Sequence, residues 1–367
     1  MKRVGNSFKG ILGGFVFILI GVVLLWWNEG NNVRNLKTTA EMDKICVDVS
    51  SETIDPSNEG KLIATHGKLI NEQEMVDEKF NIKITTPLMK RIVEVYQWEE
   101  DSSTDDDGDT TYTYKKVWSS DIIDSGNFHD KKKDNPKQKL YEDQTFASTE
   151  VKVGAFSLTS DQIKGLSTNG KYTSFNVEDA ENLNLSISGE YLTTSKDLNK
   201  PEIGDTRISF IYNNSTELSV LAVQSGNTFV DFVSKAGKSI NRVMDGTHSG
   251  TEMINVIKKE NNFIKWLLRF LGVLLIVSGI AAILKPISAI TSYVPLLGNI
   301  VGAAVGLVSL LLGLALGAIV IAVAWIRFRP ILGISLLVIA TVLIVLLVIR
   351  GKKSKASETA QVIDNQQ

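Results

Sequence analysis

The stretch that decides the fold is Gly10–Trp27, GILGGFVFILIGVVLLWW, an uncharged run of 18 residues near the N-terminus. As a helix that rises about 1.5 Å per residue, it spans roughly 27 Å, close to the hydrocarbon thickness of a bilayer. A cleaved signal peptide is the rival interpretation, but it requires a shorter apolar core followed by small residues. The run ends instead at Trp26-Trp27, and tryptophan is typical of the membrane–water interface. We therefore predict an uncleaved signal anchor whose membrane helix covers residues 8–27.

Three further apolar segments lie in the C-terminal third of the chain, at Trp266–Leu284, Ile300–Ile326 and Pro330–Ile349. Basic, proline-containing junctions separate them, and proline is common where helices start or stop. We predict four membrane helices, one before and three after a large middle region. Residues 285–299 are too short to span and too apolar for a free loop, so we expect them to lie in the interface or to re-enter the bilayer. Arg269 lies near a helix end, where a long side chain can extend to the interface.

Charge is distributed unevenly along the chain, which has 39 Lys+Arg and 41 Asp+Glu. Residues 1–27 carry three basic residues and no acidic one, and residues 263–367 carry nine basic and two acidic ones, which leaves the middle with a formal charge of −12. The basic ends predict that the short N-terminus (1–7) and the tail (350–367) are cytoplasmic. The middle region, residues 28–262, then lies outside the cytoplasm. Its acidity disfavours nucleic acid as a partner, because phosphate contacts need a cationic face.

Alternating apolar and polar residues predict several strands in the middle region. The clearest are residues 61–69, 91–98, 112–118, 206–212, 217–224 and 228–234. The last three, joined by short turns, are expected to form a meander. A helix is expected at Asp161–Leu166, and another is expected to begin near Ser249 and to continue into the second membrane helix. The predicted fold is a multispanning α-helical membrane protein with a large α+β, mainly antiparallel, extracytoplasmic domain.

Motifs for catalysis or for cofactor binding are absent from the sequence. Its three histidines lie far apart, and no HExxH, GxSxG, phosphate-binding or dinucleotide-binding glycine motif is present. The acidic stretch Asp101–Asp109 resembles part of an EF-hand loop but lacks the closing glutamate, so we prefer a solvated hairpin tip to a calcium site. We predict no catalytic residues, no metal and no cofactor. An enzyme with its site in the external domain is the least favoured alternative.

Two sets of residues are candidates for protein–protein contacts. Small residues at a spacing of four let membrane helices approach closely, within one chain or between copies, and they predict a homo-oligomer. These residues are Gly298, Gly302, Gly306, Gly313 and Gly317. Tyr96, Trp98 and Trp118 form the second set and are expected either to pack in the core or to face a partner. Tyr96 and Trp98 lie on the same face of their strand, because side chains alternate along a strand.

The chain also resembles a known family over nearly its whole length. The resemblance is carried by short motifs in a fixed order, which are Asn28-Glu29-Gly30, Asn58-Glu59-Gly60-Lys61-Leu62, Glu94-Val95-Tyr96-Gln97-Trp98 and Pro201-Glu202-Ile203-Gly204-Asp205. In this respect it is similar to the transmembrane protein 43 family, also called LUMA. The resemblance implies cytoplasmic termini, a luminal domain, self-association and a role in organising membrane protein complexes, with emerin and lamins as partners of animal members. It implies no catalytic residues.

The composition, rich in lysine, asparagine and isoleucine, points to a microbial member. The expected location is the plasma (inner) membrane if the source is bacterial, and the endoplasmic reticulum or inner nuclear membrane if it is eukaryotic. We predict a non-enzymatic membrane scaffold whose partners are the lipid bilayer, copies of itself and other membrane proteins. A pore-forming or channel-like protein is the alternative, suggested by the glycine-rich helix and by residues 285–299.

Overall fold

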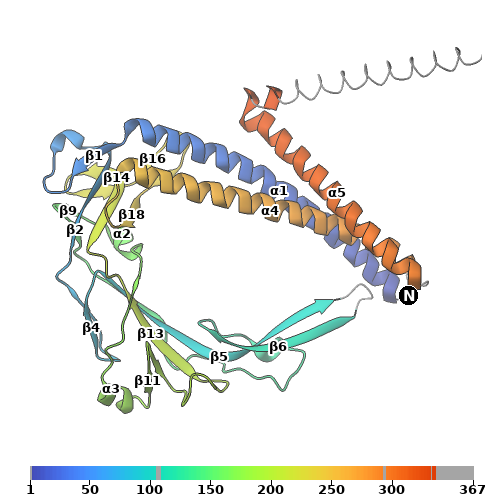
Figure 1. Cartoon of the computed structure of the whole chain (residues 1–367), viewed down its shortest axis with the longest axis horizontal. Coiled ribbons are helices and arrows are strands. Elements are labelled where there is room, and N and C mark those ends of the chain that lie inside the picture. Colours follow the sequence, from blue (N-terminus) through green and yellow to red (C-terminus); the bar gives the residue numbers. More distant parts are fainter. Residues whose placement is uncertain (1, 105–108, 292–294, 332, 336–367) are drawn as a thin grey trace, which may run out of the picture. The chain divides into compact units, whose positions relative to one another are not determined.

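The computed structural model describes residues 2–104, 109–291, 295–331 and 333–335. They form two compact units, drawn in Figure 1. The membrane unit comprises the residues up to Leu36 and those from Lys259 onward, and the β domain comprises Lys37–Lys258. The boundary between the units falls inside two long helices, which run from one unit into the other.

The described residues contain three long helices and four short ones. The long helices are α1 (Lys2–Ile45), α4 (Gly250–Thr291) and α5 (Pro295–Phe328). The short ones all belong to the β domain and are α2 (Ser160–Lys164), α3 (Val177–Asn182) and the 3-10 helices η1 (Pro56–Asn58) and η2 (Ser125–Asn127).

Three helices in the described part of the chain are long and apolar enough to cross a membrane, over Gly10–Ile45, Gly250–Pro286 and Gly302–Phe328. The chain is therefore an integral membrane protein. The predicted count of four spans is not supported, because the described residues hold three. The fourth predicted span, Pro330–Ile349, lies outside the described residues apart from its first few positions.

Both α1 and α4 extend well beyond the apolar runs that predicted them. α1 continues past Trp27 to Ile45, since no proline interrupts it and Met42 near its end is fully buried in the β domain. α4 begins after Ser249, which forms three hydrogen bonds with Glu252. The amide and the hydroxyl of Ser249 donate to the carboxylate (2.8 and 2.9 Å), and the amide of Glu252 donates to the hydroxyl (3.3 Å). This capping box confirms the predicted helix start. The unbroken course of α4 to Thr291 confirms its continuity into the second membrane helix.

The backbone of residues 285–291 is helical, because α4 contains Pro286 and ends at Thr291. Residues 292–294 lie outside the described part of the chain, and α5 begins at Pro295. Whether residues 285–299 lie in the interface or re-enter the bilayer stays a prediction.

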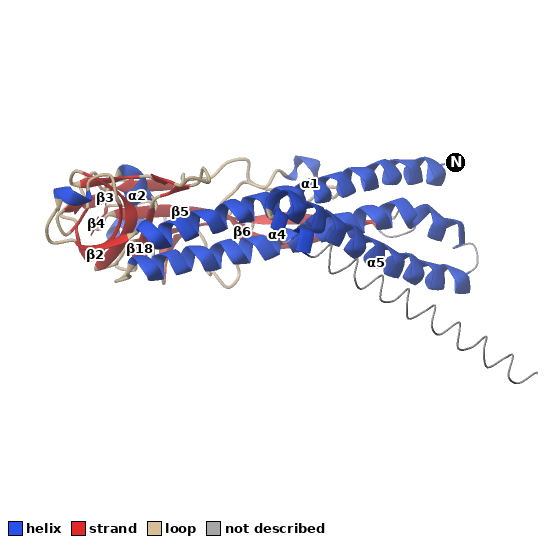
Figure 2. Cartoon of the chain, turned by 90° about the horizontal axis from the view of Figure 1, so that it is seen from above, coloured by secondary structure: helices blue, strands red, loops and turns tan. Residues whose placement is uncertain are grey.

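Within the membrane unit, α1 and α4 lie side by side (Figures 1 and 2) and touch through glycines. A Cβ added at Gly14 would lie 2.6 Å from the carbonyl oxygen of Gly279, and one added at Gly21 would lie 2.7 Å from that of Gly272. The two pairs are seven residues apart on both helices and run in opposite directions, as in an antiparallel heptad repeat. We call these four residues the glycine seam. Only glycine lets two helix backbones come so close.

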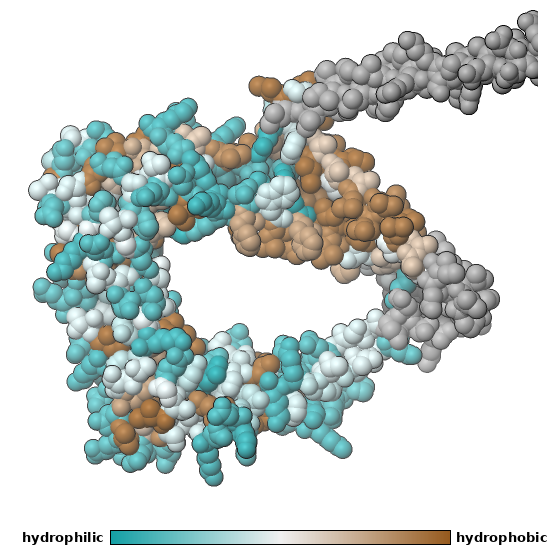
Figure 3. Space-filling model, viewed as in Figure 1, coloured by the Kyte–Doolittle hydropathy of each residue, from teal (hydrophilic) through white to brown (hydrophobic). Residues whose placement is uncertain are grey.

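α5 packs against the other two helices of the membrane unit. A Cβ at Gly317 would lie 2.9 Å from Cγ2 of Val273, and Gly313 abuts Val277, so α5 runs antiparallel to α4. The small core of the unit takes one buried residue from each helix: Leu25, Ile276 and Val320. Elsewhere the helices expose apolar side chains, which form the hydrophobic surface seen over them in Figure 3 and which suit contact with lipid.

Two seven-stranded sheets dominate the β domain. Sheet A contains β1 (Val47–Ser50), β2 (Leu62–Ile70), β8 (Lys152–Val153), β9 (Phe156–Ser157), β14 (Glu217–Ser225), β15 (Thr228–Val230) and β18 (Arg242–Asp245). Sheet B contains β5 (Leu88–Thr104), β6 (Thr110–Ser119), β7 (Gln144–Ala147), β10 (Gly170–Lys171), β11 (Ser186–Ser188), β12 (Tyr191–Thr193) and β13 (Thr206–Tyr212). Two small hairpins join β3 (Glu74–Asp77) to β4 (Ile82–Thr85) and β16 (Phe232–Val233) to β17 (Ser239–Ile240).

The strand order is β15-β14-β2-β8-β9 in sheet A, with β1 beside β2 and β18 beside β14. In sheet B it is β11-β12-β13-β5-β6, with β10 beside β13 and β7 beside β5. The described pairs are antiparallel apart from β1 with β2. The predicted mainly antiparallel domain is thus confirmed.

Sheet A is buried on both faces. Ile63 of β2 joins a cluster that includes Ile163 of α2, whereas its neighbours Leu62 and Ala64 join a second cluster on the opposite face. That second cluster contains Met42 from the end of α1 and three residues from the start of α4: Met253, Ile254 and Ile257. Because side chains alternate across a strand, the two helix ends cover one face of the sheet and α2 lies on the other.

Sheet B has one buried face and one half-exposed face. Val93 and Val95 of β5 are almost fully buried, while Glu94 and Tyr96 between them are partly exposed. On the buried side Arg91 pairs with Asp77 of β3, and both side chains are nearly inaccessible to solvent.

The predicted meander over residues 206–234 is wrong. β13 pairs with β5 in sheet B, whereas β14 pairs with β2 and β18 in sheet A, and only β14 and β15 form the expected hairpin. The chain crosses between sheets at Asn213, whose amide group donates to the carbonyl oxygen of Ser167 (2.8 Å). A short asparagine-containing connection has the same local pattern whether it turns back or crosses to another sheet.

Replacing Gly14 with alanine is expected to destabilise the membrane unit by about 1–3 kcal/mol, as overpacking does. The new Cβ would collide with the backbone of α4, which cannot yield without separating the helices. Thermal unfolding of the full chain in detergent measures the effect. Gly13→Ala is the matched control, because no described atom lies within 4 Å of a Cβ at that position. Equal stability of the two variants would contradict the glycine seam.

Cys46 follows α1 directly and is partly buried. Burial, together with the carboxylates of Asp48 and Asp43, raises the pKa of its thiol to about 11. Only the thiolate reacts with alkylating reagents, so at pH 8 we expect labelling about 100-fold slower than for an ordinary exposed thiol. The rate should rise about tenfold per pH unit between pH 8 and pH 10. Iodoacetamide labelling of this single cysteine, with the unfolded chain as control, tests this; a plateau near pH 9 would contradict it.

Candidate functional site

A buried carboxylate joins the three helices of the membrane unit. Glu29 of α1 is fully buried and accepts a hydrogen bond from Nε of Arg269 on α4 (2.6 Å) and another from the indole N–H of Trp325 on α5 (2.8 Å). Arg269 is itself only 13% exposed. We call these three residues the polar junction. It satisfies both oxygens of a charge that would otherwise be costly to bury.

Neighbouring contacts hold the polar junction in place. The side-chain amide of Asn28, also buried, donates to the carbonyl oxygen of Lys265 at 3.0 Å. The guanidinium of Arg269 lies 4.8 Å from the ring centre of Trp266 and 5.8 Å from that of Trp325. These distances allow cation–π attraction in addition to the ion pair.

Sequence reasoning missed the polar junction. Arg269 was expected to extend to the interface, but it pairs instead with Glu29, which lies just past the end of the first apolar run. The sequence does contain a signal for it: Glu29 directly follows one apolar run, and Arg269 lies inside another. Their pairing spans 240 positions of the chain, so neither local pattern reveals it.

The aromatic residues Tyr96, Trp98 and Trp118 lie on the half-exposed face of sheet B. The rings of Tyr96 and Trp118 are 5.1 Å apart, across the β5–β6 pair. All three are partly exposed rather than fully buried. The structure therefore brings them together on a surface, which we call the aromatic face.

Cations pack onto the aromatic face. Arg207 of β13 lies 4.6 Å from the ring centre of Trp118 and 4.8 Å from that of Tyr191, and it forms an ion pair with Glu94 at 2.7 Å. The amino group of Lys133 lies 4.1 Å from the ring centre of Trp98. Tryptophan, tyrosine and arginine are the residues most enriched where proteins bind one another, so this face has the chemistry of a contact surface.

The five candidate glycines of α5 differ in their surroundings. Gly313 and Gly317 pack against α4 of the same chain. For a Cβ at Gly302 or Gly306, no described atom lies within 4 Å. The surroundings of Gly298 lie outside the part of the structure that is described.

The described residues hold three helices able to cross a membrane, with an antiparallel β domain inserted between the first and the second, and this arrangement defines a multi-pass membrane protein with a large β domain. Comparison with known families places the chain more narrowly. It belongs to the transmembrane protein 43 family, whose model matches residues 95–330, so the predicted resemblance is confirmed.

Similar proteins cover almost the whole chain. Transmembrane protein 43 of Homo sapiens is 25% identical over 371 residues, which covers 96% of this chain and 92% of the relative. The Mus musculus protein is 24% identical over 349 residues (90% and 87%), and the homolog of Drosophila melanogaster is 27% identical over 342 residues (89% and 90%). No solved structure matches the chain.

Removal of the indole N–H of Trp325 is expected to destabilise the membrane unit, because Trp325→Phe leaves one oxygen of buried Glu29 without its donor. We expect a loss of about 1–3 kcal/mol, measured by thermal unfolding of the full chain in detergent. Trp27→Phe is the matched control, since that indole is 52% exposed and donates no hydrogen bond to the described residues. In a Glu29→Gln background, the effect of Trp325→Phe should change, as coupled residues are not additive. Full additivity would argue against the polar junction.

Proposed function

We propose that this protein is a non-enzymatic membrane scaffold, which self-associates through α5 and organises other membrane proteins. One observation carries the proposal: Gly302 and Gly306 have no described atom within 4 Å of an added Cβ, whereas Gly313 and Gly317 are packed on α4. The spacings of four and seven residues put all four glycines on one face of the helix. A face that permits close helix approach is therefore occupied at one end of α5 and has no described neighbour at the other; we call that end the open face.

A second copy of α5 fits this open face better than the apolar segment Pro330–Ile349 of the same chain. Gly302 and Gly306 form the small-xxx-small pattern through which helix pairs approach each other. Two copies would bring glycine against glycine, so that neither backbone carries a Cβ at the contact. Pro330–Ile349 has a single glycine, Gly333, and a Cβ there would lie 2.7 Å from the backbone of Ile326. That glycine is already in contact within the chain.

The aromatic face supplies the second part of the proposal, a contact surface for other membrane proteins. Tyr96, Trp98 and Trp118 keep part of their area exposed, and Arg207 and Lys133 lie over their rings. Such amphipathic side chains bind partners at a low entropic cost, because their rings are already held in place.

Leucine at Gly302 or Gly306 is expected to lower the fraction of cross-linked dimer several-fold in native membranes, because the side chain keeps the helices apart. Ala304→Leu is the control, since residue 304 lies on roughly the opposite side of α5 and is already exposed. Unchanged dimers in both glycine variants would remove the self-association. A lower melting temperature with unchanged dimers would assign the open face to another segment of the same chain. Protein-dependent ion flux through liposomes would instead favour the pore-forming alternative.

A further inference from the structure

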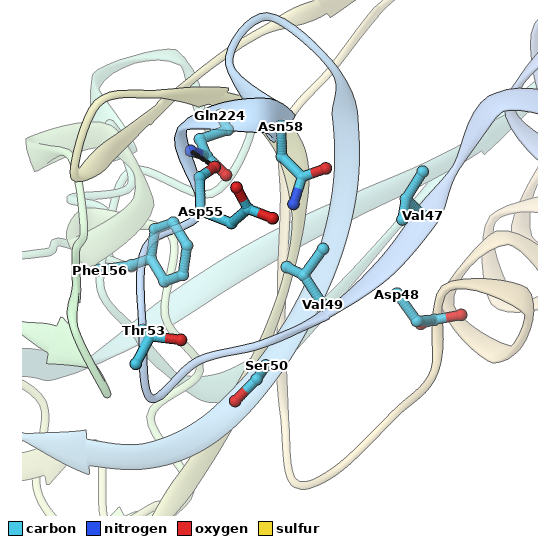
Figure 4. A pocket seen from close by; sticks show the side chains of 9 residues that line it. All are labelled: Val47, Asp48, Val49, Ser50, Thr53, Asp55, Asn58, Phe156 and Gln224. Carbon is cyan, nitrogen blue, oxygen red and sulfur yellow. Dashed lines mark hydrogen bonds between the residues drawn. The ribbon is translucent and has the colours of Figure 1, made fainter.

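The β domain contains a pocket that the scaffold role does not use. Its volume is about 400 Å³, and it lies beside sheet A, next to β1 and the residues that follow it. Polar side chains reach it from β1, from the following loop, from η1 and from β14, and Val49 and the ring of Phe156 form its apolar wall (Figure 4). A pocket of this size is typical of sites for small molecules.

Gln224 of β14 presents an unpartnered oxygen in this pocket. The residue is only 1% exposed, and its Nε2 donates to the carbonyl oxygen of Asp55 at 2.9 Å. Its Oε1 is buried and accepts no hydrogen bond from the residues that the structure describes. Flipping the amide would turn the oxygen toward the carbonyl of Asp55, which cannot donate, so the assignment is fixed by chemistry. In Figure 4 the ends of the Gln224, Asp55 and Asn58 side chains turn toward one another.

The charges that line the pocket are negative. Asp55 accepts a bond from the amide of Ser57 at 2.8 Å, which holds the pKa of its carboxyl below the usual range and keeps it ionised. Asp48 accepts a bond from the amide of Gly250 at 2.6 Å. Lysine, arginine and histidine are absent from the described residues that line the pocket, and Lys61, which acts on Asp55, lies outside that lining. A ligand that donates hydrogen bonds and carries a positive charge is therefore favoured.

We propose that this pocket binds a primary ammonium group on an aliphatic chain. The ammonium donates to Oε1 of Gln224 and to the carboxylate of Asp55, and the methylene chain lies against Val49. A bare metal ion fits less well, because its ligands must converge to about 2.3–2.6 Å from one point and the pocket is far larger than an ion. The ammonium comes from one of two sources, a free alkylamine or a lysine side chain of another protein.

Calorimetric titration of the full chain in detergent tests the proposal with two probes, 1,4-diaminobutane and Nα-acetyl-lysine amide. Asp55→Asn is expected to weaken binding at least tenfold, because it removes the charge while asparagine still caps η1. Asp124→Asn is the matched control: Asp124 caps η2 through the same bond to the amide two residues on (2.8 Å), and it does not line the pocket. The uncharged 1,4-butanediol is expected not to bind.

The two probes separate the two sources of the ammonium. Binding of the diamine alone supports a free amine, and binding of the lysine derivative, with or without the diamine, supports a protein side chain. The proposal is overturned if neither probe binds the unaltered chain, if Asp55→Asn and Asp124→Asn bind equally well, or if calcium chloride alone binds with the same dependence on Asp55.

Discussion

The close contact of α1 with α4 at the glycine seam is the constraint on which the membrane unit depends. The backbones touch at Gly14 with Gly279 and at Gly21 with Gly272, and a shift by one residue would force a Cβ against a carbonyl oxygen. One heptad further along both helices, the same register brings Asn28 beside Lys265, where their hydrogen bond forms. Glu29 then lies within reach of Arg269. The glycine seam thus sets the register of α1 against α4, and in that register the hydrogen bonds of Asn28 and Glu29 to α4 can form.

The polar junction is better explained as a device for specificity than as a source of stability. Burying each ion of the Glu29–Arg269 pair costs several kcal/mol, which the attraction between them only offsets. Hydrogen bonds between membrane helices contribute on average about 0.6 kcal/mol and at most about 1.7 kcal/mol. The net gain is small, but an arrangement that removed the Trp325 indole would leave a buried carboxylate oxygen unpaired. The junction therefore penalises other positions of α5 more than it stabilises this one.

Local sequence patterns predicted the elements of this fold well, and contacts between distant segments poorly. The apolar runs located three helices, and alternation located β2, β5, β6, β13 and β14, because both signals come from neighbouring residues. The assignment of β13 and β14 to different sheets was missed, since a pairing partner leaves no local trace. Glu29 was missed as a site residue for the same reason. The extension of α1 to Ile45 was missed because Met42 is held by packing against sheet A rather than by helix propensity.

The aromatic residues of sheet B lie on its half-exposed face and not in its core. Core packing and partner binding were alternatives for Tyr96 and Trp98. The buried face of β5 is formed by the alternate residues of the strand, among them Val93 and Val95, so the two aromatic residues lie on the opposite face. The aromatic rings pack on each other and on Arg207 without leaving the surface.

The glycines of α5 lie in two kinds of surroundings, packed against α4 or without a described neighbour. At Gly313 and Gly317 the missing side chains let the helix lie against α4, and beyond them the polar junction fixes its end through Trp325. Gly302 and Gly306 continue the same face without a described neighbour. Since the two pairs of glycines occupy different turns of the helix, a second copy docking at Gly302 and Gly306 would not disturb the packed turns. Association by the proposed route therefore requires no repacking of the chain itself, which favours preformed monomers that assemble in a second step.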